Sequence, residues 1–284
     1  MRVHFLGTGA SPSMPIAFCS CAACRSARKA GGKNLRRRSS LLVDGVVLID
    51  MGPDVTTASF DQSVSLERIR LCLQTHPHED HLDPEPIISR HPEWGTVPET
   101  TLSMVASLTT LKQLDRMVAN RSGLGSLFDP AAQKLLRLEL VPVEAFEDRD
   151  FDGYRVMAYP ANHANEYDSL LFSINDGKRA IFYGSDTSSI AESVWEGLSR
   201  AGVQFDLMIF DQTYGIGMET RDHLAAVEVV RYVQSVRERG ILKADGSVYV
   251  THLSHEGIRE HEELENYASG WGYHVAYDGL SLEL

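Results

Sequence analysis

The sequence lacks any long hydrophobic run and has fewer basic than acidic side chains. No apolar stretch reaches the roughly 20 residues of a membrane-spanning helix, so we expect no membrane association. Lys and Arg number 27 against 39 Asp and Glu, and the formal net charge of −12 disfavours general binding to nucleic acid or anionic lipid. With 22 Gly and 11 Pro in 284 residues, collagen-like and wholly disordered chains are excluded as well.

Cysteine is also scarce, and its placement is uneven. There are four cysteines, three of them within residues 19–24. Disulfides between such close neighbours are strained, and clustered thiols in a reducing compartment more often bind metal. The chain turns polar and glycine-rich directly after Leu6, which is not typical of a signal peptide. We therefore expect a cytoplasmic protein.

The remaining pattern predicts alternating strands and helices in one α/β domain spanning residues 1–284. Asp44-Gly45 between two apolar runs is typical of a tight hairpin turn. Residues 84–136 combine proline-rich turns with a helical pattern over 102–118, so we expect a helical insertion or lid there. Strands are expected at 3–6, 40–43, 46–50, 70–74, 154–159, 170–174, 180–183, 207–210, 248–250, 274–277 and 280–284, and further helices at 188–200 and 224–236.

Metal-ligating side chains gather directly after the strand expected at 70–74. His76 and His78 are two residues apart, and such residues point to the same side of an extended segment. They can therefore hold one ion together, while Asp80 and His81 follow at once and can reach a second ion. Imidazole and carboxylate ligands suit Zn, Mn or Fe.

Three further candidates each follow a predicted strand. They are His163, Asp186 and His252. Singly, each is more often a capping or surface residue, but together they could complete two coordination shells. The Asp186 carboxylate could bridge two cations, an arrangement that activates a hydroxide shared between them.

The order of these motifs resembles the metallo-β-lactamase superfamily. Its signature is an H-x-H-x-D-H run followed by a lone His, a lone Asp and a final His. The resemblance implies an αββα sandwich with two divalent ions, Mn or Zn, in a cleft at one edge. By the resemblance, the first ion takes His76, His78 and His163, the second takes Asp80, His81 and His252, and Asp186 bridges them.

The cysteine cluster offers three thiolates, whereas a closed zinc site needs four ligands. Cys72 lies inside a predicted strand and is expected in the core. His255, three residues after His252, is the better fourth ligand. We therefore expect a structural zinc held by Cys19, Cys21, Cys24 and His255.

These features together resemble the PhnP-like branch, the phosphoribosyl cyclic phosphodiesterases. The resemblance runs end to end outside the predicted insertion. It is carried by residues 6–9, 19–24, 76–81, 185–187, 221–223, 251–255 and 277–279. It implies a small, cyclic phosphate diester as substrate and a hydroxide activated by two metal ions as nucleophile. A homodimer is a further expectation.

Two more residues take a catalytic role by this resemblance. His223, at the start of a predicted helix, resembles the general acid that protonates the leaving oxygen, and Asp211 resembles the carboxylate that orients it. Asp80 counts with them as a catalytic residue besides its place in the second shell. Each residue also has a purely structural interpretation. His223 could be a histidine at a helix start that bonds to its neighbours, and Asp211 could be an aspartate at a strand end that caps a helix.

Arg36-Arg37-Arg38 stands out in an acidic protein, because guanidinium groups are suited to phosphate. We expect one of the three to face the cleft and two to be solvated, without a basis for choosing among them. Three other functions stay open: a tRNA 3′-processing nuclease, which the net charge disfavours, a carboxylic ester or lactone hydrolase, and a PqqB-like protein without diesterase activity.

Overall fold

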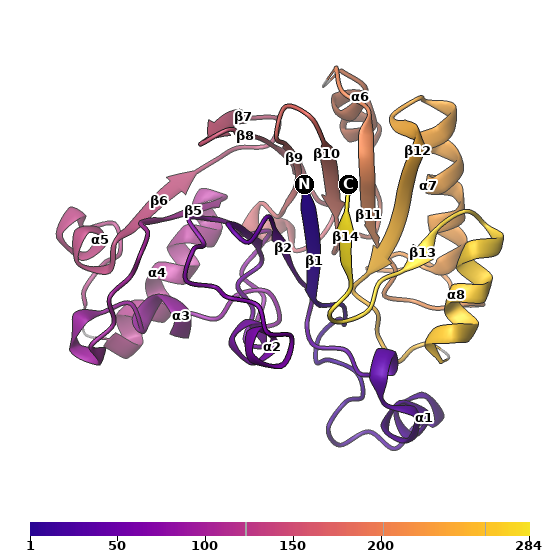
Figure 1. Cartoon of the computed structure of the whole chain (residues 1–284), viewed down its shortest axis with the longest axis horizontal. Helices are drawn as coiled ribbons and strands as arrows, with labels where there is room; N and C mark the ends of the chain where they lie inside the picture. The colour runs from indigo at the N-terminus through magenta and orange to yellow at the C-terminus, as the bar shows by residue number, and fades with distance from the viewer. Residues whose placement is uncertain (123, 201, 259) are drawn as a thin grey trace.

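The computed structural model describes residues 1–122, 124–200, 202–258 and 260–284, which form two seven-stranded sheets (Figure 1). The first sheet has the order β14-β1-β2-β3-β4-β5-β6 and the second has the order β13-β12-β11-β10-β9-β8-β7. The strands of the first sheet are β1 (Arg2–Gly7), β2 (Ser40–Val43), β3 (Val47–Ile49), β4 (Leu71–Leu73), β5 (Leu102–Ala106), β6 (Leu138–Pro142) and β14 (Ser281–Glu283). Those of the second are β7 (Asp148–Phe151), β8 (Tyr154–Pro160), β9 (Leu170–Asn175), β10 (Ala180–Gly184), β11 (Phe205–Asp211), β12 (Leu242–Thr251) and β13 (His274–Val275).

Helices cover the outer face of each sheet. The first sheet carries α2 (Val55–Asp61), α3 (Glu85–Ile88), α4 (Leu108–Ser122) and α5 (Pro130–Leu136). The second carries α6 (Glu192–Arg200), α7 (Ala226–Glu238) and α8 (His261–Gly270), while α1 (Ala22–Ala30) lies beyond the strand ends (Figure 1). Short 3₁₀ turns are η1 (Gly32–Asn34), η2 (Pro92–Trp94) and η3 (Asn165–Tyr167).

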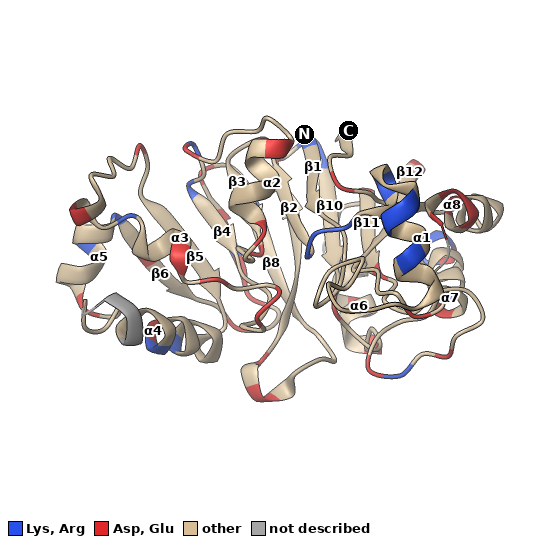
Figure 2. Cartoon of the chain, turned by 90° about the horizontal axis from the view of Figure 1, so that it is seen from below, with Lys and Arg blue, Asp and Glu red and all other residues tan. Residues whose placement is uncertain are grey.

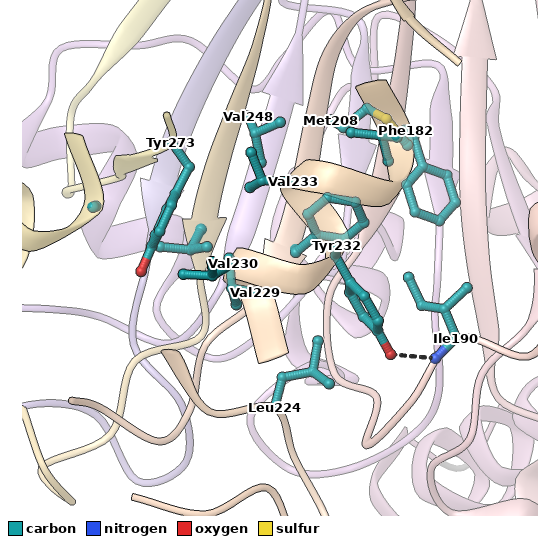
Figure 3. Packing of buried hydrophobic residues seen from close by; sticks show 14 of the residues in the cluster. Phe182, Ile190, Met208, Leu224, Val229, Val230, Tyr232, Val233, Val248 and Tyr273 are labelled. Carbon is teal, nitrogen blue, oxygen red and sulfur yellow. Dashed lines mark hydrogen bonds between the residues drawn. The ribbon is translucent and has the colours of Figure 1, made fainter. Parts of the chain in front are cut away.

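Three apolar layers hold these elements together. One lies between the two sheets and combines side chains of β1–β5 with side chains of β8–β11. The second joins the outer face of the first sheet to α2–α5. The third joins the second sheet to its helices, and Figure 3 shows Val233 of α7 beside Val248 of β12. The predicted αββα sandwich is confirmed.

The predicted hairpin is present at β2 and β3. Asp44 and Gly45 both have positive φ, 51° and 71°, as the tight turn between twisted antiparallel strands requires. In the described part of the chain, no helix combines the length and the apolar character needed to cross a lipid bilayer.

The prediction for residues 84–136 is correct in expecting helices there and wrong about where the helix over 102–118 begins. Residues 102–106 form β5, which pairs in parallel with both β4 and β6, so the helix expected from 102 begins only at Leu108. Through β5 the segment is built into the first sheet, and Met117 of α4 lines the cavity beside Asp80. A short apolar run in a buried parallel strand cannot be distinguished from a helix by its periodicity. Residue 123 of this segment lies outside the described residues.

Candidate metal centre

The predicted ligands come together because they follow neighbouring strands. β3, β4 and β5 are mutually parallel, as are β10, β11 and β12, so their carboxyl ends meet at common edges. At three of these ends the chain turns inward through positive φ: 61° at Asp50, 62° at Asp186 and 61° at His252. Non-glycine residues in this conformation are strained, and such strain concentrates at functional sites.

The first expected shell is assembled in the structure. One ligand atom each of His76, His78, His163 and Asp186 lies within 4.8 Å of the others. His163 Nε2 is 3.1 Å from His78 Nδ1, and His76 Nε2 is 3.2 Å from Asp186 Oδ2. The histidines 76 and 78 follow β4, His163 follows β8 and Asp186 follows β10, so three separate segments supply this cluster.

The second expected shell is assembled beside the first. Ligand atoms of Asp80, His81, His252 and Asp186 also lie within 4.8 Å of one another. His81 Nε2 is 2.9 Å from Asp186 Oδ2 and 3.2 Å from Asp80 Oδ2, and His252 Nε2 is 3.3 Å from Asp80 Oδ2. Asp186 belongs to both clusters, which is the position of a bridging carboxylate.

The polar atoms at the centre of these clusters fit cations. His76 Nε2 and Asp186 Oδ1 are buried and have no hydrogen-bond partner among the described residues, and such orphaned groups are costly. Burial, together with the neighbouring histidines, lowers the pKa of His76, which keeps its imidazole neutral and able to ligate. Burial opposes ionisation of Asp186, but the surrounding histidines lower its pKa well below the usual range. This nitrogen and oxygen donor set fits divalent ions such as zinc and manganese.

A second layer of side chains, which holds the candidate ligands in place, was not predicted from the sequence. His81 Nδ1 donates to Asp50 Oδ2 at 2.7 Å, while Asp50 Oδ1 accepts from the backbone N–H of Thr75 at 2.9 Å. The Asp50 side chain is fully buried. A carboxylate behind a ligating histidine sets its tautomer and orientation. Asp50 could have been found from the sequence because it lies at the end of a predicted strand, as the candidate metal ligands do on their own strands.

His252 is oriented in a similar way from the other side. Its Nδ1 lies 2.7 Å from Thr213 Oγ1, and Thr213 Oγ1 donates to Asp211 Oδ2 at 3.1 Å. With Nδ1 as the donor, Nε2 of His252 is free to face Asp80. Asp211 is thus linked to the second shell through Thr213.

His223 lies at the edge of the same centre, as expected. Its Nδ1 is 3.2 Å from Asp211 Oδ2 and 3.0 Å from Asp186 Oδ1. Burial disfavours the imidazolium, yet the neighbouring carboxylates of Asp186 and Asp211 raise the pKa of His223 to about 11. The side chain is 14% exposed and lines a cavity of about 350 Å³ together with His78, His163 and Asp186. His223 therefore borders both the metal ligands and the open cavity.

The cysteine cluster closes around His255. Its Nδ1 is 3.5 Å from the sulfur atoms of Cys19 and Cys21 and 3.6 Å from that of Cys24. Cys21 caps α1 by accepting from the backbone N–H of Cys24, and this bond lowers the pKa of the Cys21 thiol to about 6. Cys72 lies apart, fully buried in β4. Four convergent S and N donors fit a tetrahedral zinc ion.

The three arginines 36–38 have different surroundings. Arg36 is buried and donates to Thr8 Oγ1 and to the carbonyl of Ala276. Arg37 pairs with Asp61, and Arg38 lines a cavity of about 460 Å³ next to the metal centre. A further cavity, of about 860 Å³, lies elsewhere, between the ends of β6 and β8, and none of the candidate metal ligands lines it.

Comparisons with known proteins agree with this geometry. Residues 46–253 match the model of a family described as the beta-lactamase superfamily domain. The search of curated proteins gives no match. Among solved structures, a diphosphatase of the PhnP family is 23% identical with a TM-score of 0.71, the alignment covering 100% of this chain and 98% of that one.

Two other solved structures show the same fold at lower identity. Zinc-bound PqqB from Methylobacterium extorquens is 16% identical, with a TM-score of 0.66 and full coverage of both chains. The short form of human tRNase Z is 18% identical, with a TM-score of 0.65 and coverage of 100% of this chain and 99% of that one. At these identities the likeness concerns the fold alone.

Proposed function

Because this chain belongs to the metallo-β-lactamase superfamily, we propose that it is a metal-dependent phosphodiesterase that hydrolyses a small, cyclic phosphate diester. The observation that carries the proposal is His223, held by Asp211 on the cavity wall beside both ligand clusters. A diester whose leaving group is an alkoxide needs a proton at that oxygen, and a positioned histidine supplies one. The diphosphatase and the tRNase among the solved structures of this fold support hydrolysis at phosphorus.

The two ligand clusters would hold the metal ions. His76, His78 and His163 would bind the first ion, Asp80, His81 and His252 the second, and Asp186 would bind both. Two divalent cations held there would neutralise charge on the phosphoryl oxygens and lower the pKa of a bound water that serves as nucleophile. Zinc and manganese both accept these ligands.

The chain's own residues divide the remaining work. Asp50 and Thr213 hold His81 and His252 in the tautomers that leave Nε2 free for ligation. Asp211 accepts the Nδ1 proton of His223, because a carboxylate can only accept. No hydrogen bond of His223 Nε2 is present within the described ranges, so this atom is available to give a proton to the leaving oxygen.

A structural zinc at Cys19, Cys21, Cys24 and His255 completes the proposal. His255 lies three residues after His252 on the same loop. The zinc would tie the segment before α1 to this loop and so fix the rim of the cavity, which Ile16 and His255 both line. It would take no part in the reaction.

The experiment compares two diesters with different leaving groups. The metal-loaded protein is assayed with bis(4-nitrophenyl) phosphate, whose leaving group departs unprotonated, and with a nucleoside 2′,3′-cyclic phosphate, which releases an alkoxide. We expect His223→Ala to slow the cyclic substrate by about 10²- to 10⁴-fold and the nitrophenyl ester far less. His274→Ala, at an exposed histidine paired with Glu265, is the matched control and should resemble the wild type.

Each other outcome has a distinct meaning. If His223→Ala lowers the hydrolysis rate of both substrates equally, His223 is not the general acid, but the protein is still a diesterase. No turnover of either diester by the metal-loaded wild type would overturn the phosphodiesterase proposal. Carboxylic esters and lactones would then be the substrates to examine.

A further inference from the structure

We propose that the loop carrying His255 positions His223, so that the cysteine cluster regulates the general-acid step from outside the metal centre. The His223 loop is defined as residues 212–225, between β11 and α7, and the His255 loop as residues 252–258, after β12. The inference rests on the proposed function for the role of His223. It stands on three observations: a backbone contact between the loops, the polar contacts that join them, and the attachment of the His255 loop to the cysteines.

The first observation is a contact between the loops that leaves no room for a side chain. A Cβ atom added to Gly215 of the His223 loop would lie 2.0 Å from the carbonyl oxygen of Gly257 in the His255 loop. A Cβ atom added to Gly257 would lie 2.3 Å from Cγ of Met218, so the Met218 side chain packs on this glycine. Gly257 also has a φ of 65°, which favours glycine. The two glycines therefore let the loops meet backbone to backbone.

The second observation is a set of polar contacts across the same junction. The backbone N–H of Gly215 donates to the Glu256 carbonyl at 2.9 Å, and Ser254 Oγ donates to the Thr213 carbonyl at 2.8 Å. The Arg221 guanidinium donates to the Glu256 carboxylate at 2.6 Å. Because an exposed ion pair contributes little to stability, the two hydrogen bonds to carbonyls and the glycine contact provide most of the attachment.

The junction lies next to His223 in space as well as in the chain. The backbone N–H of Tyr214, which directly precedes Gly215, donates to the carbonyl of Leu224 at 3.0 Å. The Tyr214 hydroxyl donates to Asp222 at 2.5 Å. Tyr214 is therefore bonded to both chain neighbours of His223. A shift of Gly215 would reach the His223 ring through these two bonds.

The third observation is that the same loop closes the cysteine cluster. His255 Nδ1 lies 3.5 Å from the sulfur atoms of Cys19 and Cys21. The next residue, Glu256, supplies the carbonyl that accepts from Gly215. The coupling free energy between two sites is reciprocal. The closed cluster therefore stabilises the position of the His223 loop as much as the docked His223 loop stabilises the cluster.

The test begins with Gly215→Ala, which separates the loops without changing His223 or a metal ligand. On the metal-loaded protein we expect hydrolysis of a nucleoside 2′,3′-cyclic phosphate to slow by about 10- to 100-fold, because displacement of a catalytic group by about 1 Å has this effect. Bis(4-nitrophenyl) phosphate should be affected far less, since its leaving group needs no proton. The double variant Gly215→Ala/His223→Ala should be no slower than His223→Ala, because both changes act on one step.

Two further variants of the same loop make the comparison selective. Met218→Ala removes the side chain that packs on Gly257 and should give a smaller loss of the same kind. Glu219→Gln, at an exposed residue, is the matched control and should resemble the wild type. Thermal melting checks the fold of each variant. If Gly215→Ala does not fold, Met218→Ala decides between the same outcomes.

A second measurement reads the coupling from the other end and needs no turnover. The metal-loaded protein is treated with a chelator and dithionitrobenzoate, which reports the thiols of Cys19, Cys21 and Cys24 as they are released from zinc. Cys72 is fully buried and does not contribute in the folded protein. We expect these thiols to react about 10-fold faster in Gly215→Ala than in the wild type, because the coupling is reciprocal.

The outcomes separate this inference from the proposed reaction. Equal losses on both diesters in Gly215→Ala would assign its effect to the metal ligands and overturn the inference. Wild-type rates on both diesters, or wild-type thiol reactivity, would overturn it as well. If the wild type hydrolyses neither diester while Gly215→Ala still releases its thiols faster, the proposed reaction fails and the coupling between the loops stands.

Discussion

Asp50 shows how a residue outside the ligand set can control the site. It is fully buried, accepts from His81 Nδ1 and is held in turn by the N–H of Thr75. The charge of this carboxylate makes the His81 imidazole a better ligand, and its position prevents the ring from flipping. Substitution should therefore act on metal affinity before it acts on the fold.

We predict that Asp50→Asn weakens metal binding by about 10- to 100-fold. Asparagine keeps an oxygen for Thr75 but loses the charge that faces His81. Competition with a chromogenic chelator measures the affinity, and thermal melting without metal serves as the folding check. Asp61→Asn, an exposed carboxylate on α2, is the control. If Asp50→Asn binds metal as tightly as the wild type, Asp50 does not support the metal ligand His81.

Asp278 couples stability to pH through a different buried network. It accepts from Thr8 Oγ1 and from the Arg37 backbone N–H, and burial raises the pKa of its carboxyl to about 6 despite the nearby arginines. His261, beside Arg36, has its pKa lowered to about 4 by burial and by that charge. The two groups therefore oppose each other between pH 4 and 6.

The sign of the Asp278 contribution follows from its raised pKa. Between its unfolded pKa of 3.8 and about 6, the folded state binds more protons, so this contribution is present at low pH and is lost as pH rises. We predict that Asp278→Asn gains stability relative to the wild type across this window, by about 3 kcal/mol. Urea unfolding at pH 4.5 and pH 7 measures the difference. The stability difference between His261→Gln and the wild type should change with pH in the opposite direction, because the folded state binds a proton at His261 less readily than the unfolded state. A pH-independent difference between Asp278→Asn and the wild type would contradict the assignment.

At the scale of elements, the segment from Cys19 to α1 depends on its contacts with a distant loop. α1 has only nine residues, and only two of them, Cys24 and Ala27, are buried. Isolated helices of this length are marginal in water. Its attachment to His255, more than 230 residues away, is therefore expected to provide much of its order.

We predict that Cys24→Ser removes one zinc per chain and makes the segment before α1 sensitive to protease. The remaining ligands Cys19, Cys21 and His255 leave an open site that holds zinc weakly. Elemental analysis gives the zinc count, and limited trypsin digestion at Arg25 and Arg28 reports the local order. Cys72→Ala, in the core of β4, should change stability without changing the zinc count. Equal zinc contents in Cys24→Ser and the wild type would argue against the structural zinc.

The elements also show where periodicity succeeds and where it fails. The hairpin of β2 and β3 is predictable because its turn residues Asp44 and Gly45 are local signals. β5 is not, because a buried parallel strand presents apolar residues on both faces, and its identity depends on pairing with β4 and β6. Leu102 and Ala106 contact the helices while Val105 faces the other sheet, a division that only the sandwich creates.

At the scale of the whole molecule, the charge distribution limits the partners. Figure 2 shows basic residues gathered on α1, whereas over the other elements basic and acidic residues are interspersed. Of the basic residues of α1, Arg25 donates to the Ser20 carbonyl, and Arg28 to the carbonyls of Cys19 and Ile16. With a net charge of −12, the molecule has a weak electrostatic drive toward a polyanion.

We predict that the protein binds transfer RNA too weakly to measure at a salt concentration of about 150 mM, where the Debye length is about 8 Å. Fluorescence anisotropy with labelled RNA is the measurement. Hydrolysis of bis(4-nitrophenyl) phosphate in the same buffer shows that the sample is active. Tight binding together with cleavage at the 3′ end of the RNA would favour the nuclease function instead. The expected homodimer stays a prediction for light scattering.

The sequence by itself determined which donor side chains are available at the candidate centre. The type of each residue shows whether its side chain can ligate a metal. The spacing of the residues His76, His78, Asp80 and His81 places four donor groups at the end of one strand. The downstream ligands were recognisable because each follows an apolar strand. These are local signals, so no neighbouring strand had to be known to read them.

Only the tertiary structure decided what depends on which segments become neighbours. It placed Arg38, rather than Arg36 or Arg37, in a cavity beside the metal centre, because burial of Arg36 and the position of Asp61 are properties of the folded surface. It revealed Asp50 behind His81, since β3 and β4 pair in parallel and end together. A contact between two segments far apart in the chain produces no pattern in the sequence of either segment. Such contacts are therefore visible only once the two sheets are packed together.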